Sequence, residues 1–119
     1  MKSVKGIVLH RTVSSTSRSA VLTTFKNKGL TGFHAVVDKD GSITQVNNFD
    51  NRANHVGAKK GKSGISSYNS IGVEVVGNSL DGEGNPTMDW REVESWENLT
   101  SDQIENTAQL VVTLMDEIA

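Results

Sequence analysis

The segment Asn69–Gly77 constrains the fold of this chain more than any other part of the sequence. It is a short apolar run bounded by glycine and polar residues, which is typical of a strand buried inside a sheet. Because side chains alternate along a strand, Ile71, Val73 and Val75 share one face and Glu74 lies on the other. A buried carboxylate without a partner costs free energy, so the sequence predicts a cation, a base or a raised pKa at Glu74. A structural ion pair with Lys or Arg is the alternative interpretation.

Length and composition indicate one soluble globular domain. The chain has 119 residues, of which 35% are hydrophobic and 22% are charged, enough for one core but not for two. The net charge of −2 gives no argument for nucleic acid as a partner, and no apolar run approaches the ~20 residues of a membrane span. The N-terminus lacks the apolar region of a signal peptide, so the localisation is left unassigned. The absence of cysteine means that any metal must be held by His, Asp or Glu.

The order of apolar patterns predicts an α/β fold with a central mixed β-sheet flanked by helices. Thr100 and Gln103 form a capping-box pattern at the start of the last helix, and Gly41 lies in the turn of a hairpin. Expected strands are residues 4–10, 33–37 and 43–46 and the Glu74 segment, and expected helices are residues 17–28 and 100–119. An apolar stripe on the last helix comprises Ile104, Ala108, Val111 and Met115, widened by Leu114 and Ile118.

Three histidines are candidate reactive groups. His10 ends the first strand, and ligands of open α/β sheets lie outside the carboxyl ends of strands. His34 lies on a strand and has a plain interpretation as a core histidine, whereas His55 lies in a glycine-containing turn. None shows the His-x-x-x-His spacing of a helical metal site, so spacing alone gives a weak metal signal. The sequence also lacks a Gly-x-Ser-x-Gly elbow and a Walker-type loop.

Four short segments occur in a fixed order along the chain. They are Ile-Val-Leu-His-Arg-Thr at 7–12, Phe-His-Ala-Val-Val-Asp-Lys-Asp-Gly at 33–41, Ala-Asn-His-Val-Gly at 53–57 and Asn-Ser-Ile-Gly-Val-Glu at 69–74. In this order they resemble the zinc-dependent N-acetylmuramoyl-L-alanine amidases of type 2, the superfamily shared with peptidoglycan recognition proteins. The resemblance implies a mixed sheet with flanking helices, and hydrolysis of the amide that joins N-acetylmuramic acid to L-alanine.

The resemblance also implies a site. His10 matches the first zinc ligand, and Glu74 matches the carboxylate that acts as general base. His55 matches a histidine of the substrate groove, and Asn69, in the Glu74 segment, is expected to contact substrate. The expected cofactor is Zn2+, because zinc with three protein ligands activates water that a nearby carboxylate deprotonates. The expected partner is peptidoglycan or a muropeptide, with neither nucleic acid nor membrane.

The chain departs from the family pattern at its C-terminal end. In the family the second zinc histidine and the third ligand follow the helix that here ends at Ala119, and no histidine follows His55. We therefore expect 1–119 to be a single amidase-like domain that lacks the C-terminal zinc-ligand segment. Three explanations stay open. A second polypeptide segment completes the domain, or a rearranged site uses His10 and His34 with His55 or Glu74, or the chain is a non-catalytic module that binds peptidoglycan or a protein.

Overall fold

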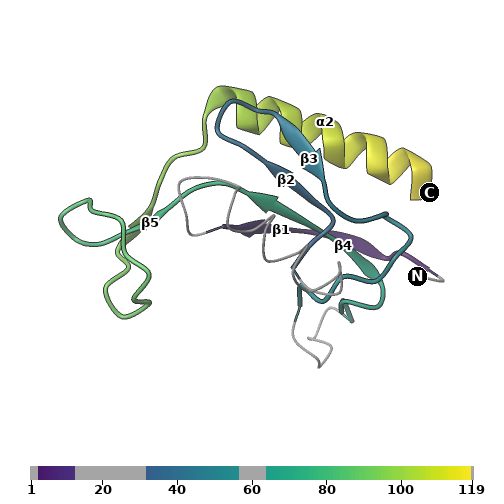
Figure 1. The fold of residues 1–119 in the computed structure, drawn as a ribbon, viewed down its shortest axis with the longest axis horizontal. Helices are drawn as coiled ribbons and strands as arrows, with labels where there is room; N and C mark the ends of the chain where they lie inside the picture. The colour runs from purple at the N-terminus through teal and green to yellow at the C-terminus, as the bar shows by residue number, and fades with distance from the viewer. Residues whose placement is uncertain (1–2, 13–31, 57–63, 119) are drawn as a thin grey trace.

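The computed structural model describes residues 3–12, 32–56 and 64–118, and the helix expected at 17–28 lies outside them. The main sheet has the strand order β1-β4-β2-β3. Its strands are β1 (Gly6–Arg11), β2 (Ala35–Val37), β3 (Ile43–Gln45) and β4 (Ser70–Val75). The helix α2 (Ser101–Ile118) lies across one face of this sheet (Figure 1). The predicted α/β fold with a central mixed sheet is confirmed.

The strand that contains Glu74, β4, is one of the two interior strands of the main sheet. β4 pairs in parallel with both β1 and β2, and β2 pairs with β3 in the antiparallel sense. Ile71 and Val73 are almost fully buried and pack with Val37 and Leu114 in the core between the sheet and α2. Burial of each such side chain stabilises the fold by about 1.5–3 kcal/mol, so this apolar face of β4 fixes the strand in the middle of the sheet.

The hairpin of β2 and β3 is joined to the helix through its turn. Gly41 has a φ of 86°, a conformation that glycine adopts without strain, and its N–H donates to the carbonyl of Asp38 at 2.9 Å. The Asn106 amide on α2 donates to the Gly41 carbonyl at 2.9 Å. A Cβ at position 41 would lie 2.5 Å from that amide nitrogen, so glycine also permits the close approach of hairpin and helix.

The predicted capping box is present at the start of α2. The Gln103 N–H donates to Thr100 Oγ1 at 3.1 Å, and the Thr100 N–H donates to Gln103 Oε1 at 3.0 Å. Gln103 is only 1% exposed, and its Nε2 donates to the carbonyl of Val76 at 2.8 Å. The same side chain therefore caps the helix and attaches it to the end of β4.

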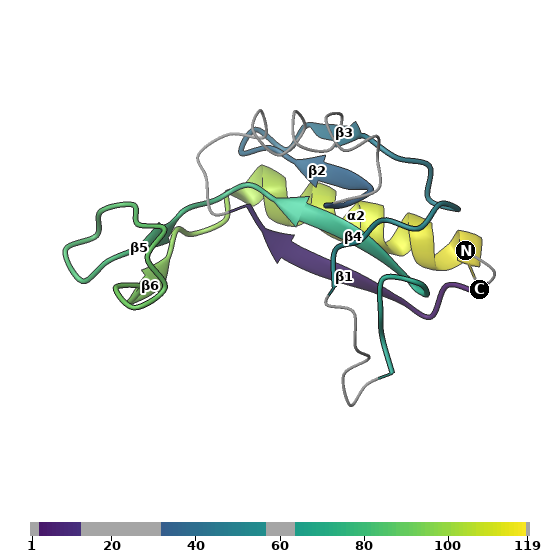
Figure 2. The same cartoon turned by 60° about the horizontal axis from the view of Figure 1, so that its bottom comes forward.

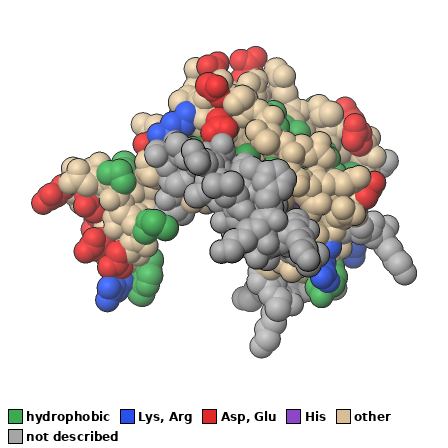
Figure 3. All heavy atoms as spheres, in the orientation of Figure 1, with side chains coloured by type: hydrophobic (Ala, Val, Ile, Leu, Met, Phe, Trp, Pro, Cys, Tyr) green, Lys and Arg blue, Asp and Glu red, His purple; other side chains and the backbone are tan. Residues whose placement is uncertain are grey.

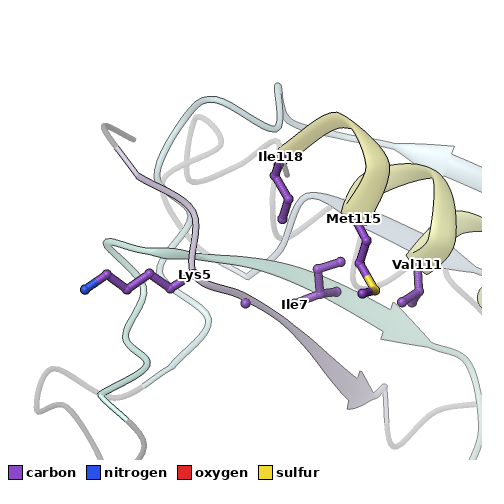
Figure 4. Close-up of a pocket in the computed structure, with 6 residues that line it drawn as sticks. Lys5, Ile7, Val111, Met115 and Ile118 are labelled. Carbon is purple, nitrogen blue, oxygen red and sulfur yellow. The ribbon is translucent and has the colours of Figure 1, made fainter.

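Only part of the apolar stripe predicted from the sequence lies on the buried side of α2: Leu114 packs in the core, and the residues Ile104 and Met115 do not. The buried positions of the helix are Gln103, Thr107 and Leu114, whereas Ile104 and Met115 are 56% and 55% exposed. The hydrogen bond from Gln103 to the Val76 carbonyl helps to set which side of α2 faces the sheet. A hydrophobic pattern does not predict a contact made by a polar side chain. Part of the stripe lines a groove of about 320 Å³ between β1 and α2 (Figure 4).

A second, two-stranded sheet projects from the main body. Its strands are β5 (Ser79–Leu80) and β6 (Ser95–Trp96), which pair in the antiparallel sense. Residues 77–98, called the arm below, extend beyond the arrowheads of β1 and β4 (Figures 1 and 2). Within the described residues, no helix has the length and apolar character needed to cross a membrane.

Replacing Thr100 by Ala tests the cap. The variant loses the acceptor for the Gln103 N–H and the hydroxyl that donates to the Lys39 carbonyl at 2.5 Å. We expect the free energy of unfolding to fall by about 1 kcal/mol, measured by urea denaturation. The control Ser101→Ala, at an exposed position of the first turn, should change it by less than about 0.5 kcal/mol. Equal losses in the two variants would contradict a capping role.

Candidate active site

The structure brings His10 and Glu74 together. They are Cα partners in the parallel pairing of β1 and β4, and each is the penultimate residue of its strand. Partners in register on adjacent strands project from the same face of the sheet. That face is opposite the one on which Ile71 and Val73 pack against α2. The two residues singled out from the sequence therefore share one rim of the sheet, at the carboxyl ends of its strands.

His55 joins this pair from the segment that follows β3. Its Nδ1 lies 2.9 Å from His10 Nε2, and the two rings meet edge to face with centroids 5.2 Å apart. The loop around His55 is fixed by Ser67, whose hydroxyl accepts from the N–H groups of His55 and Val56 at 3.1 and 2.9 Å. The same hydroxyl donates to the Val56 carbonyl at 2.9 Å, so this hydroxyl holds His55 in place.

The hydrogen bonds around His55 fix the tautomers of the neutral pair. Ser70 Oγ donates its proton to the Ser66 carbonyl at 2.5 Å, so it only accepts from His55 Nε2 at 3.1 Å. The Ser70 carbonyl, 3.2 Å from the same nitrogen, also accepts. Nε2 of His55 therefore carries a proton and Nδ1 is an acceptor. It follows that His10 Nε2 is the donor in the contact between the two histidines.

Gly72 makes room for His55 on the face of β4. A Cβ at position 72 would lie 2.6 Å from Cγ of the His55 ring, closer than real atoms approach. Glycine inside a strand weakens the strand but permits such an approach. The role of Gly72 was not anticipated from the sequence, although a glycine in the middle of an apolar strand is the signal that points to it.

Burial sets the charge states of the cluster. It raises the pKa of Glu74 to about 7, and Oε2 of this carboxyl is buried without a hydrogen-bond partner among the described residues. Burial also lowers the pKa of His10 and, as the largest cause, that of His55. In both cases the charged form is the one disfavoured. Near neutral pH the cluster therefore combines uncharged imidazoles with a carboxyl group that readily gains or loses a proton.

His34 has a structural role. It is fully buried, its Nδ1 accepts from the N–H of Gly72 at 3.0 Å, and its Nε2 donates to the carbonyl of Asn51 at 2.6 Å. Both ring nitrogens are therefore occupied by the backbone, and burial lowers the pKa of His34 as the largest cause. The rearranged metal site that included His34 has no free nitrogen on this residue.

Asn69 shapes the loop that leads into β4. Its Oδ1 accepts from the N–H of Ser66 at 2.8 Å, and its Nδ2 donates to the carbonyl of Gly64 at 3.0 Å. The side chain is 8% exposed. Contact of Asn69 with substrate stays a prediction, and the bonds that it makes are those of a residue that holds a turn.

The residues of this chain do not form a complete zinc site. In the described residues no group of three or more His, Asp or Glu side chains is arranged to hold a metal ion. The remaining segments, 1–2, 13–31, 57–63 and 119, contain no His, Cys, Asp or Glu. Three protein ligands are usual at a catalytic zinc, and His10, even with His55 and Glu74 beside it, does not supply them in this arrangement.

The chain is therefore an α/β domain in which imidazole and carboxyl groups meet at the carboxyl ends of the strands of a mixed sheet, where ligands of such sheets bind. Comparison with protein families matches residues 1–119 to the N-acetylmuramoyl-L-alanine amidases, and the chain belongs to this family. No curated protein gives a significant match. At the level of the family, the chain is an amidase-like peptidoglycan hydrolase, and the resemblance of the four segments is confirmed.

Replacing Gly72 by Ala tests the packing of His55. The new methyl group overlaps the imidazole, so we expect a loss of about 1–3 kcal/mol in the free energy of unfolding. The His55 ring should also move away from His10, which changes its nitrogen chemical shifts in NMR spectra. The control Gly82→Ala places its Cβ at an ordinary 3.5 Å from Glu94 Cγ and should cost less. A Gly72 variant as stable as this control would contradict the packing argument.

Replacing Glu74 by Gln tests the buried carboxyl. Its pKa of about 7 in the fold exceeds the ordinary value of 4.5, so the folded state holds this proton more tightly than the unfolded state. The contribution of Glu74 to stability therefore decreases as the pH rises from about 4.5 to about 7, by on the order of 3 kcal/mol. The lowered pKa values of the histidines make stability rise with pH, which is the opposite direction. This effect is common to the unchanged chain and the variant, so it cancels in the difference between their stabilities.

Urea denaturation between pH 4 and pH 8 measures this difference. Glu74→Gln should match the unchanged chain at the acid end and exceed it in stability at pH 8. The exposed residue Glu83 gives a matched control, because Glu83→Gln should change stability by less than about 0.5 kcal/mol. A stability difference for Glu74→Gln that is constant across this pH range would show that the carboxyl is not buried as described.

Proposed function

We propose that this chain acts on the amide between N-acetylmuramic acid and L-alanine, with Glu74 as the group that transfers the proton. The observation that carries the proposal is the buried, unpartnered Oε2 of Glu74 beside His10 at the carboxyl ends of β1 and β4. Buried polar groups normally find partners in folded proteins. A carboxyl group without one, with a pKa of about 7, is suited to a ligand that supplies the missing proton or hydrogen bond.

Hydrolysis of an amide needs a proton removed from water and a proton delivered to the departing amine. A carboxyl group with a pKa near the working pH performs both transfers, because both of its protonation states are populated. The uncharged His10 and His55 leave the carboxylate without a fixed counter-charge, which preserves its basicity. His55 is held by Ser67 and Ser70 and in turn orients the His10 ring beside Glu74.

The proposal also has to explain how zinc would be bound when this chain supplies too few ligands. We infer that residues 1–119 act as one amidase-like domain, and that any Zn2+ bound at His10 takes further ligands from a second polypeptide segment. The inference is supported by the described residues, in which no group of three or more His, Asp or Glu side chains is arranged to hold a metal ion, whereas a catalytic zinc usually has three protein ligands. Zinc binding measured by calorimetry on the purified chain should be weak, and tight binding to this chain alone would contradict it.

A second candidate function is supported by the same shortage of ligands. The chain would then bind peptidoglycan, or a protein, without cleaving it, as a module of the same fold. The two candidate functions differ in whether the bound muropeptide is cleaved. Binding of a muropeptide with no release of peptide, even with zinc present, would favour the binding module.

The test of hydrolysis uses a soluble muropeptide and mass spectrometry to detect the released peptide with a free L-alanine amine. We expect Glu74→Gln to reduce kcat by at least about 100-fold, because removal of a general acid–base group typically costs 100- to 10,000-fold. The exposed-site control Glu83→Gln should retain the rate. Release of peptide at the same rate by Glu74→Gln would rule out Glu74 as the proton-transfer group.

A further inference from the structure

β1 lies at an edge of the main sheet, and no described strand lies beyond it (Figure 2). Thr12, directly after β1, donates from its N–H to the carbonyl of Val75 at 3.2 Å, toward β4. Backbone groups point alternately to the two sides of a strand, so the N–H and carbonyl groups of Ile7 and Leu9 point away from β4. Such a row of unpaired groups is a template for an added strand.

β1 lacks the features that normally protect a sheet edge from pairing. Proteins keep edge strands very short, or place a proline or a bulge in them. β3, at the other edge, has three residues. β1 has six, as many as the interior strand β4, and its sequence Gly-Ile-Val-Leu-His-Arg contains no proline. The edge of β1 is therefore suited to pairing.

An apolar groove lies beside this edge, between β1 and α2 (Figure 4). Ile7 lines it from β1, and Val111, Met115 and Ile118 line it from α2. Met115 is 55% exposed and Ile118 is 38% exposed. Leu9, which lies on the same face of β1 as Ile7, is 52% exposed. A strand added to β1 would cover these side chains while pairing the free backbone groups.

The charge around the groove indicates which kind of strand fits. α2 contains no Lys or Arg, and its acidic side chains lie along the side of the molecule where α2 lies (Figure 3). They are Asp102, Glu105, Asp116 and Glu117, and none has an ion pair among the described residues. The carboxyl end of a helix adds further negative potential next to Ile118. The Lys5 side chain extends away from the groove (Figure 4). The groove therefore attracts a basic segment.

A second copy of the chain fits this surface less well. Antiparallel pairing of two β1 strands would place the Lys5 end of one copy beside the Arg11 end of the other. It would also bring two acidic α2 helices together. Like charges placed opposite each other destabilise such a pairing.

We propose that the edge of β1 and the groove beside it bind an extended segment of a partner protein, which alternates apolar and polar residues and is basic at its ends. The segment adds a strand to the sheet, pairing with the backbone of Ile7 and Leu9 and placing its apolar side chains in the groove. Its basic ends lie near the acidic residues of α2. The groove is on the face of the sheet opposite Glu74, so this inference does not depend on the proposed function.

The probe is the peptide acetyl-Lys-Lys-Val-Thr-Val-Thr-Val-Lys-Lys-amide, and calorimetry should show saturable binding. Amide hydrogen exchange followed by NMR locates the bound peptide. The N–H of Leu9 should exchange at least about tenfold more slowly in the complex. The N–H of Val8, which points toward β4, should change little. The same peptide with Glu in place of each Lys should bind at least about tenfold more weakly.

Met115→Lys tests the groove, because it places a charge among the apolar side chains and repels the basic ends of the peptide. We expect at least about tenfold weaker binding. The matched control is Val112→Lys, the same kind of change on α2 at a residue that is 58% exposed and does not line the groove. It should weaken binding by less than about threefold. Circular dichroism checks that both variants keep the fold.

The proposal is overturned if the lysine peptide shows no saturable binding, if the glutamate peptide binds equally well, or if Met115→Lys binds as tightly as Val112→Lys. It is also overturned if the Leu9 N–H exchanges slowly without peptide and sedimentation shows a dimer, since a second copy would then occupy the edge. Release of peptide from a muropeptide is measured separately. Probe binding without release rejects the proposed hydrolysis alone, and release without probe binding rejects this inference alone.

Discussion

The parallel pairing of β1 with β4 is the interaction on which the site depends. It sets the register in which His10 is the partner of Glu74. A shift of one residue would place Leu9 or Arg11 opposite the carboxylate and turn His10 toward α2. The register is fixed from the other face of the sheet, where Ile71 and Val73 pack in the core beneath the helix. The apolar face of one strand therefore positions the reactive groups on its opposite face.

Most buried polar side chains around that pairing are satisfied; among the described residues, the buried side-chain atoms without a hydrogen-bond partner are Arg11 Nε, Glu74 Oε2 and Thr107 Oγ1. His34 has both ring nitrogens bonded to the backbone, Asn69 closes the turn before β4, and Gln103 attaches α2 to the sheet. Glu74 stands apart, because its Oε2 has no partner among the described residues and burial raises its pKa to about 7. Of the three unsatisfied side chains, Glu74 is the one with a raised pKa, which is why the proposed function assigns the proton transfer to it.

The same end of the sheet carries the arm. Arg11 follows His10 along β1 and alternates to the other face, where it contacts Trp96 and the Glu97 backbone. One strand end thus contributes an imidazole to the candidate active site and a guanidinium to the base of the arm.

The sequence by itself determined the strand at Glu74, the hairpin around Gly41 and the capping box at Thr100, because each is encoded by neighbouring residues through alternation, turn preference and capping. The four short segments likewise determined the family. Only the tertiary structure decided that His55 bonds to His10 over Gly72 and that Gln103 and Leu114, but not Ile104 or Met115, lie on the buried side of α2. It alone also decided that one oxygen of the Glu74 carboxylate has no partner among the described residues. These features depend on contacts between residues far apart in the chain, and such contacts cannot be predicted from local periodicity.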